Sequence, residues 1–184
     1  IIADSKATIT VESVADGLKV YDNPVGVLTN NPTFDKHMFL LNNYMNLTVK
    51  VPENRFSASL DLHRYSWGMG AIGLPGDLSS TSRFTRAAFI KSNSLCDGDE
   101  RSGVGQFFHI MDTVSQPKGC TVLDSGKYEI TLYTSCCSAE KGIYYYTTYG
   151  NRQITAVNMH KEDLFGCDLV RYPVICDEQI KMQN

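Results

Sequence analysis

The sequence lacks any run of apolar residues that approaches the ~18 needed for a membrane-spanning helix. Its first residues, Ile1-Ile2-Ala3-Asp4, do not form the pattern of a signal peptide. An excess of positive charge is missing too, because the formal net charge of the 184 residues is −3 and the lysines and arginines are scattered. These absences argue against membrane insertion and against nucleic acid as a partner.

Motifs for metals and cofactors are also absent. Of the six cysteines, no two have C-x-x-C spacing, and no histidine stands at zinc-ligand spacing from them. Adjacent Cys136 and Cys137 would point to opposite faces of a strand, which is poor geometry for sharing one ion. The glycine-rich stretch 68–76 fits neither a phosphate loop nor a dinucleotide fingerprint. We therefore expect reduced thiols in a cytoplasmic protein that has neither a metal nor a cofactor.

The composition, with 42% apolar and 20% charged residues, is that of one ordinary globular domain. Strict alternation over Ala7–Glu12 predicts a half-buried strand, and Leu18–Tyr21 follows a turn signal as its hairpin partner. The short apolar run Val25, Val27 and Leu28 predicts a third strand over Val25–Asn30. The start of the chain is thus expected to be a three-stranded antiparallel meander.

Helical patterns follow the meander, and strand patterns follow the helices. Thr33 is a candidate N-cap for a helix whose apolar stripe is Phe34, Met38, Leu41 and Met45. Further expected elements are a helix through Phe84 and Lys91 with several N-cap candidates at Ser79–Ser82, a helix over Val104–Ser115, a strand over Tyr128–Cys136, a hairpin of Ile143–Tyr149 with Gln153–Met159, and a last strand at Tyr172–Ile175. This order of elements predicts an α+β fold with antiparallel sheets packed against helices.

Asn30 and Arg83 stand out as candidate site residues. Asn30 and Asn31 end an apolar run, so a carboxamide there could donate to an oxyanion at the rim of the core, although Asn31-Pro32 is also ordinary turn chemistry. Arg83 falls in the first turn of the expected second helix, where the helix dipole disfavours a cation by ~0.3–1 kcal/mol. We therefore expect Arg83 to have a specific partner, and we predict that it meets Asn30.

The segment Val51–Ser66 has no sustained hydrophobic period and is predicted to be a long arm without regular structure. Loops of this length inside a compact domain usually serve function or assembly. The arm mixes Phe56, Leu60, Leu62 and Tyr65 with charged residues, a composition that suits an interface with another subunit.

Three blocks of sequence follow one another along the chain: VGVLTNNPTFD, then LLNNYMNL with GMGAIGLPGDLSSTSRF, and finally YTSCCSAEKGIYYYTTYGNRQITAVNM. Together they resemble the choloylglycine hydrolase family, which contains conjugated bile salt hydrolases and penicillin V acylases. These are N-terminal-nucleophile (Ntn) amidases. The resemblance implies an αββα four-layer sandwich with antiparallel sheets. It also implies hydrolysis of the amide bond in glycine- or taurine-conjugated bile salts.

The resemblance assigns the family's active-site asparagine to Asn30, as an oxyanion donor, and its active-site arginine to Arg83, near the nucleophile. It identifies no substrate-binding residue and implies a homotetramer assembled through the arm Val51–Ser66. Family members begin with a catalytic cysteine after processing, whereas this chain begins with Ile1. Residues 1–184 are therefore expected to be the C-terminal part of a single longer domain and to be inactive alone. A penicillin V acylase and a noncatalytic degenerate fragment remain the alternatives.

Overall fold

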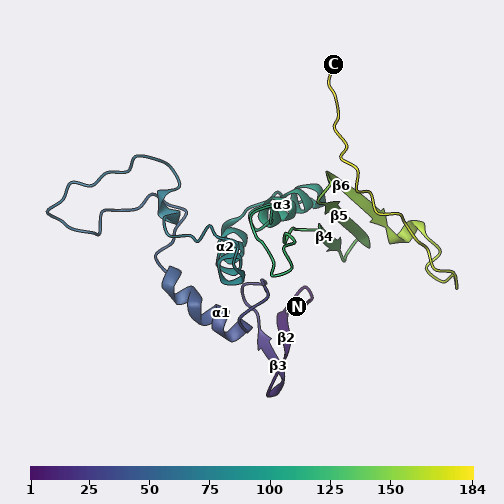
Figure 1. Ribbon diagram of the computed structural model, residues 1–184, viewed down its shortest axis with the longest axis horizontal. Helices are drawn as coiled ribbons and strands as arrows, with labels where there is room; N and C mark the ends of the chain where they lie inside the picture. Colours follow the sequence, from purple (N-terminus) through teal and green to yellow (C-terminus); the bar gives the residue numbers. More distant parts are fainter. The chain divides into compact units, whose positions relative to one another are not determined.

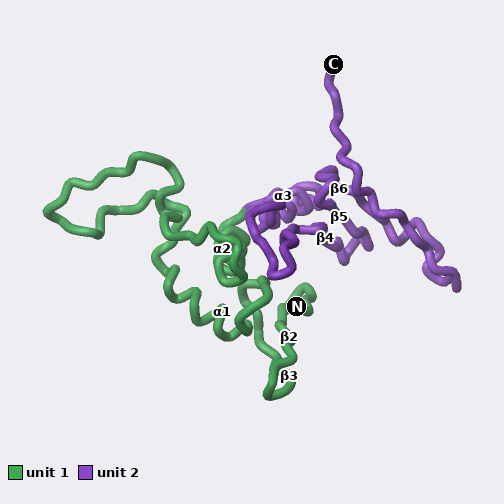
Figure 2. Tube along the Cα trace, viewed as in Figure 1, with its two compact units in different colours: residues 1–94 green, residues 95–184 purple.

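The computed structural model describes all residues from Ile1 to Asn184. The chain divides into two compact units, Ile1–Ser94 and Leu95–Asn184, which Figure 2 shows in green and purple. Each unit has its own antiparallel sheet and its own helices, so each is described by itself.

The first unit opens with a three-stranded antiparallel sheet in the order β1-β2-β3 (Figure 1). The strands are β1 (Ile2–Ala3), β2 (Thr8–Val14) and β3 (Gly17–Asp22). Gly17 has a φ of 108°, a left-handed value that glycine adopts without strain, and it closes the tight turn between β2 and β3. The hairpin predicted for these residues is confirmed.

The predicted third strand, Val25–Asn30, is wrong: no strand forms there, and the third strand of the sheet is β1, which pairs with β2. The reason lies in Asn23, whose side chain is 3% exposed. Its Nδ2 donates to Thr10 Oγ1 and to the Val27 carbonyl oxygen, both at 2.9 Å, and its Oδ1 accepts from Gly26 N at 2.7 Å. This one side chain binds the backbone of Gly26 and Val27 and the hydroxyl of Thr10 in β2, and so stabilises a turn where a third strand was predicted.

Two helices of the first unit carry its core. Helix α1 (Phe34–Leu40) begins after Thr33 and continues as the 3₁₀ helix η1 (Leu41–Tyr44). Helix α2 (Ser80–Asn93) begins after Ser79, whose side chain accepts from Ser82 N at 3.4 Å as an N-cap. The predicted start of α1 is confirmed, and of the N-cap candidates Ser79–Ser82 the structure uses Ser79.

The aromatic residues Phe34 and Phe84 are almost completely buried, at 2% and 0% exposure. Their rings meet edge to face with centroids 6.2 Å apart, which joins α1 to α2. The predicted α1 stripe is wrong at its end, because Met45 is 80% exposed and lies beyond η1. His37 rather than Met38 shares the fully buried face with Phe34.

No helix or strand occurs between η1 and the short 3₁₀ helix η2 (Met69–Ala71), so the long arm is confirmed as an irregular segment. Figure 1 shows it as an open loop between α1 and α2. Its base is closed where Thr48 N donates to the Gly70 carbonyl oxygen at 3.0 Å. A Cβ at Gly70 would lie 2.1 Å from the Lys50 carbonyl oxygen, so only glycine fits this close approach.

The second unit contains helix α3 (Glu100–Asp112) and a sheet in the order β4-β5-β6. The strands are β4 (Tyr133–Ser138), β5 (Ile143–Thr148) and β6 (Asn151–Asn158), and the 3₁₀ helix η3 (Met159–Lys161) follows. The predicted hairpin is confirmed as β5-β6. Helix α3 starts earlier than predicted, because Asp99 caps it by accepting from Ser102 N at 3.0 Å.

Two strand predictions in this unit need correction. Strand β4 begins at Tyr133 rather than Tyr128. The last strand, predicted at Tyr172–Ile175, is absent. That segment is instead attached through side-chain hydroxyls: Thr148 Oγ1 donates to the Ile175 carbonyl oxygen at 3.1 Å, and Ile175 N donates to the Tyr146 hydroxyl at 3.4 Å. None of the helices is long and apolar enough to cross a membrane.

Candidate active site

The segment that carries Asn30 is attached to the first turn of α2. Thr29 Oγ1 donates to the Ser80 carbonyl oxygen at 3.0 Å, and the Ser80 hydroxyl donates back to Thr29 Oγ1 at the same distance. Asn31 N donates to Ser80 Oγ, also at 3.0 Å. The residues on both sides of Asn30 are therefore held by one serine, and a ladder is not needed to fix the segment.

Arg83 meets Asn30, as predicted. Its Nη2 donates to Asn30 Oδ1 at 2.8 Å across 53 positions of sequence, and its Nε donates to the Leu78 carbonyl oxygen at 3.1 Å. A guanidinium near a helix start is thus balanced by two oxygen acceptors. Since Oδ1 is occupied by Arg83, the two N–H groups of Asn30 Nδ2 remain available as donors, and Asn30 is exposed.

His37 contacts Thr29, the residue before Asn30, and was not predicted as part of this site. Its ring is 1% exposed and stacks on Phe84 with centroids 4.4 Å apart, and its Nε2 lies 3.3 Å from Thr29 Oγ1. Burial lowers the pKa of His37, and the negative charge of Glu12 opposes that shift. The helical spacing of His37 from Phe34, three residues on, was the available signal that it would share the buried face.

The loop before α2 is fixed by charged side chains of the same unit. Arg86, which is 8% exposed, donates through Nη1 to the carbonyl oxygens of Pro75 at 2.6 Å and Asp77 at 3.1 Å. The side chain of Asp77 accepts hydrogen bonds from Ser79 and Ser82, which lower its pKa from 3.8 to about 2. This network holds the backbone that presents the Leu78 carbonyl oxygen to Arg83.

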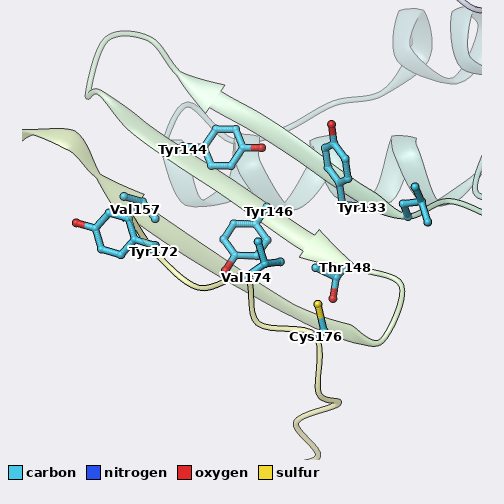
Figure 3. A pocket seen from close by; sticks show the side chains of 9 residues that line it. Tyr133, Tyr144, Tyr146, Thr148, Val157, Tyr172, Val174 and Cys176 are labelled. Carbon is cyan, nitrogen blue, oxygen red and sulfur yellow. The ribbon is translucent and has the colours of Figure 1, made fainter. Parts of the chain in front are cut away.

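The second unit has a separate cavity of about 530 Å³ that the sequence did not predict. Figure 3 shows tyrosines of the sheet on one side and the segment around Tyr172 and Val174 on the other. The lining residues are Leu132, Tyr133, Tyr144, Tyr146, Thr148, Val157, Tyr172, Val174 and Cys176. It contains no carboxylate, histidine or lysine for acid–base work near neutral pH. The Asn30–Arg83 pair combines a cation with a fixed amide group, so it is the stronger candidate for stabilising developing negative charge.

Comparison with known proteins agrees with the resemblance seen in the sequence. Residues 1–175 match the family model described as linear amide C–N hydrolases, choloylglycine hydrolase family. A protein of Lactiplantibacillus plantarum named bile salt hydrolase/transferase is 54% identical over 184 residues, which is 100% of this chain and 57% of that protein. The chain thus spans little more than half the length of this relative.

Solved structures give the same result. A conjugated bile acid hydrolase from Clostridium perfringens matches with a TM-score of 0.85 and 41% identity, over 96% of this chain and 54% of that one. Penicillin V acylase from Agrobacterium tumefaciens matches with a TM-score of 0.64 and 19% identity, over 85% of this chain and 43% of that one, and supports the fold alone. The predicted α+β class, as part of an Ntn-hydrolase fold with antiparallel sheets, is confirmed. Family model, sequence identity and fold agree that the chain belongs to the choloylglycine hydrolase family.

Proposed function

We propose that this chain is the C-terminal part of a longer enzyme, called the complete enzyme below, that hydrolyses the amide bond of glycine- or taurine-conjugated bile salts. The names of the relatives support this substrate class. The observation that carries the proposal is the 2.8 Å hydrogen bond from Arg83 to Asn30, which gives the amide of Asn30 one fixed orientation. The complete enzyme would act in the cytoplasm.

The proposed role of Asn30 is to stabilise the oxyanion. When a nucleophile adds to the scissile carbonyl group, negative charge develops on the carbonyl oxygen, and fixed N–H donors lower the energy of that state. One such donor is worth ~2.7–4 kcal/mol in comparable sites. The Nδ2 end of Asn30 suits this role because Arg83 already occupies the acceptor end of the amide.

Arg83 has two proposed roles. Its guanidinium orients Asn30, and as a fixed cation it favours the thiolate form of a nearby cysteine nucleophile. The Nε atom of the same guanidinium donates to the Leu78 carbonyl oxygen at 3.1 Å, so the position of the cation is fixed by the protein. Loop 75–78 and helix α2 thereby act together as the support of the charged group.

No residue of this chain is assigned the role of nucleophile. In the proposed mechanism an N-terminal cysteine attacks, and its own α-amino group accepts the proton. The six cysteines here have peptide-bonded nitrogens, which are not bases, so they lack the second half of that arrangement.

Exposed apolar residues agree with a chain that packs against further structure. The buried apolar core consists of five residues, Phe34, Phe84, Ala87, Ala88 and Phe108. Many large apolar side chains are exposed instead, among them Leu18 at 70% and Leu132 at 69%. Such surface is unusual for a protein that is stable alone, and we propose that the rest of the enzyme covers part of it.

The arm Val51–Ser66 is proposed to join subunits into a homotetramer. Phe56 and Tyr65 in the arm, and Trp67 just after it, are 83%, 84% and 77% exposed, and the Arg64 guanidinium lies 4.2 Å from the centre of the Trp67 ring. Aromatic and arginine side chains of this kind are enriched at protein interfaces. Aromatic residues that are this exposed on an irregular segment do not contribute to the packing of this unit, and contact with another subunit would bury them.

The test is to assay the complete enzyme with glycine- and taurine-conjugated bile salts and with penicillin V, side by side. A kcat/KM for bile salts that exceeds the value for penicillin V supports the proposal. The reverse order would favour the penicillin V acylase alternative. Absence of both activities in a folded protein would favour the noncatalytic alternative.

A further inference from the structure

The hydroxyl group of Thr29 takes part in three hydrogen bonds but has only one proton to donate. That proton goes to the Ser80 carbonyl oxygen. The Ser80 hydroxyl donates to Thr29 Oγ1, so the contact between Thr29 Oγ1 and His37 Nε2 at 3.3 Å requires His37 to donate as well. His37 therefore carries a proton on Nε2, and the surroundings of Nδ1 decide whether the ring is neutral.

The other ring nitrogen of His37 fits this assignment. Nδ1 is buried and has no hydrogen-bond partner, so a proton placed there would find no acceptor. The stacking of the ring on Phe84 leaves it no room to expose Nδ1 to water. Thr29, Ser80 and His37 together form a polar network that is satisfied at every atom except the bare Nδ1.

From this network we infer that Ser80, acting through Thr29 and Asn31 and supported by His37, is a positioning residue for Asn30 in amide hydrolysis. The inference rests on the oxyanion role proposed for Asn30. Ser80 touches neither the reacting atoms nor Asn30 itself. It binds the residue before Asn30 and the residue after it, at 3.0 Å in each case, and so fixes the backbone from which the Asn30 side chain extends.

The helix does not need the Ser80 hydroxyl for its own stability. Ser79 is the N-cap of α2 and accepts from Ser82 N, whereas the Ser80 hydroxyl points to the Thr29–Asn31 segment. Arg83 follows one turn later on the same helix and holds the side-chain oxygen of Asn30. Helix α2 therefore fixes Asn30 twice: Ser80 holds its backbone, and Arg83 holds its amide.

The test uses the complete enzyme and a glycine-conjugated bile salt. We expect Ser80→Ala to lower kcat on the order of tenfold, since a small displacement of a catalytic donor is costly, and to change KM by less than about twofold. Ser94→Ala is the control at the other end of the same helix. It removes a hydroxyl that donates to the Ile90 carbonyl oxygen, and it should keep the wild-type kcat at temperatures where the protein is folded.

A double-mutant comparison separates positioning from a general structural effect. In the Asn30→Ala background, Ser80→Ala should cause no further loss of kcat, because the residue that it positions is gone. An unchanged kcat in Ser80→Ala, or an equal loss in both backgrounds, would overturn the inference and leave the proposed function standing. An unchanged kcat in Asn30→Ala would instead overturn the oxyanion role and, with it, this inference.

Two further measurements test the network itself. Thr29→Val removes the hydroxyl and should reproduce the kcat loss, whereas Thr29→Ser retains it and should restore most of the activity. In enzyme labelled with ¹⁵N-histidine, the ring signals of His37, assigned by their disappearance in His37→Gln, should report the neutral tautomer with its proton on Nε2. A proton on Nδ1, or loss of activity in Thr29→Ser equal to that in Thr29→Val, would contradict the network.

Discussion

The Nη2 atom of Arg83 donates to Oδ1 of Asn30 over 2.8 Å. Because a guanidinium only donates, this contact decides which end of the Asn30 amide faces Arg83 and which end is left to meet a substrate. The orientation of the amide by Arg83 and the proposed donation by Asn30 Nδ2 are therefore separable, and different substitutions can remove one without the other.

Replacing Asn30 tests the donation. In the complete enzyme, Asn30→Ala should lower kcat by ~10²-fold or more with the fold intact, because the oxyanion loses a fixed donor. Asn30→Asp should lose as much although it keeps an oxygen for Arg83, since a carboxylate has no N–H group. Asn42→Ala is the control, because Asn42 is exposed and bonds only to the Phe39 carbonyl oxygen. Steady-state kinetics and circular dichroism measure the effects, and a wild-type kcat in Asn30→Asp would remove Asn30 from the oxyanion role.

Replacing Arg83 tests the orientation. Lysine has a single ammonium group and cannot hold both Asn30 Oδ1 and the Leu78 carbonyl oxygen in the fixed geometry of a guanidinium, so Arg83→Lys should lower kcat by roughly tenfold to a hundredfold. The control is Arg152→Lys, which alters an exposed ion pair with Asp112 and should have little effect. If the two variants had equal kcat values, the cation at Arg83 would matter only through its charge or not at all.

The carboxylate of Asp77 gives a pH-dependent prediction. Hydrogen bonds from Ser79 and Ser82 hold its pKa at about 2, below the ordinary 3.8, so its contribution to stability is present above about pH 4 and is lost as the pH falls toward 2. Asp77→Asn should therefore melt at a lower temperature than wild type at pH 7, and the difference should shrink between pH 4 and pH 2. Calorimetry of both proteins, with exposed Asp168→Asn as the control, measures this. A difference that stays constant with pH would show that the charge of Asp77 is not involved.

The arm gives a prediction about mass in solution. Its base is already closed by the Thr48–Gly70 hydrogen bond, so replacing Val51–Ser66 by a short glycine-serine linker should leave α1 and α2 in place. The shortened complete enzyme should have a lower mass by light scattering than the tetramer expected for the full protein. An unchanged mass with an unchanged melting temperature would refute the role of the arm in assembly.

The isolated chain of 184 residues should not hydrolyse amides. Ile1 has an α-amino group but only hydrocarbon in its side chain, so the base of the proposed mechanism is present without its nucleophile. The measurement compares the purified chain with the complete enzyme on glycine- and taurine-conjugated bile salts. Turnover by the short chain at the rate of the long one would place the nucleophile among the six cysteines of this chain.

Local sequence signals predicted the elements that depend on local physics. The alternation that predicted β2, the N-cap candidates Thr33 and Ser79–Ser82, and the turn signal between β5 and β6 each act within a few residues, and the structure confirms the elements that they mark. The meeting of Asn30 with Arg83 was predictable because each residue was unusual in its own setting and the family resemblance linked them.

Two of the errors arose where side chains made contacts in place of the predicted backbone pairing. The segment Val25–Asn30 has an apolar run like that of a strand, but the Asn23 side chain binds the backbone of Gly26 and Val27 in a turn, and a single buried carboxamide leaves no periodic signal. The segment Tyr172–Ile175 is held by hydroxyl groups from β5 in the same way. Ser80 and Thr29 were missed as partners because 51 positions separate them and both are common residues of helix starts and turns.

Because two residues of α2 hold Asn30, its side chain is ordered before any substrate binds. A free asparagine side chain samples several rotamers and both amide orientations, and restricting them costs conformational entropy at the moment of use. Here Arg83 and Ser80 impose the restriction when the helix folds. A substrate that reached Asn30 would meet a donor whose disorder had already been removed, so the ordering cost would belong to folding rather than to each catalytic cycle.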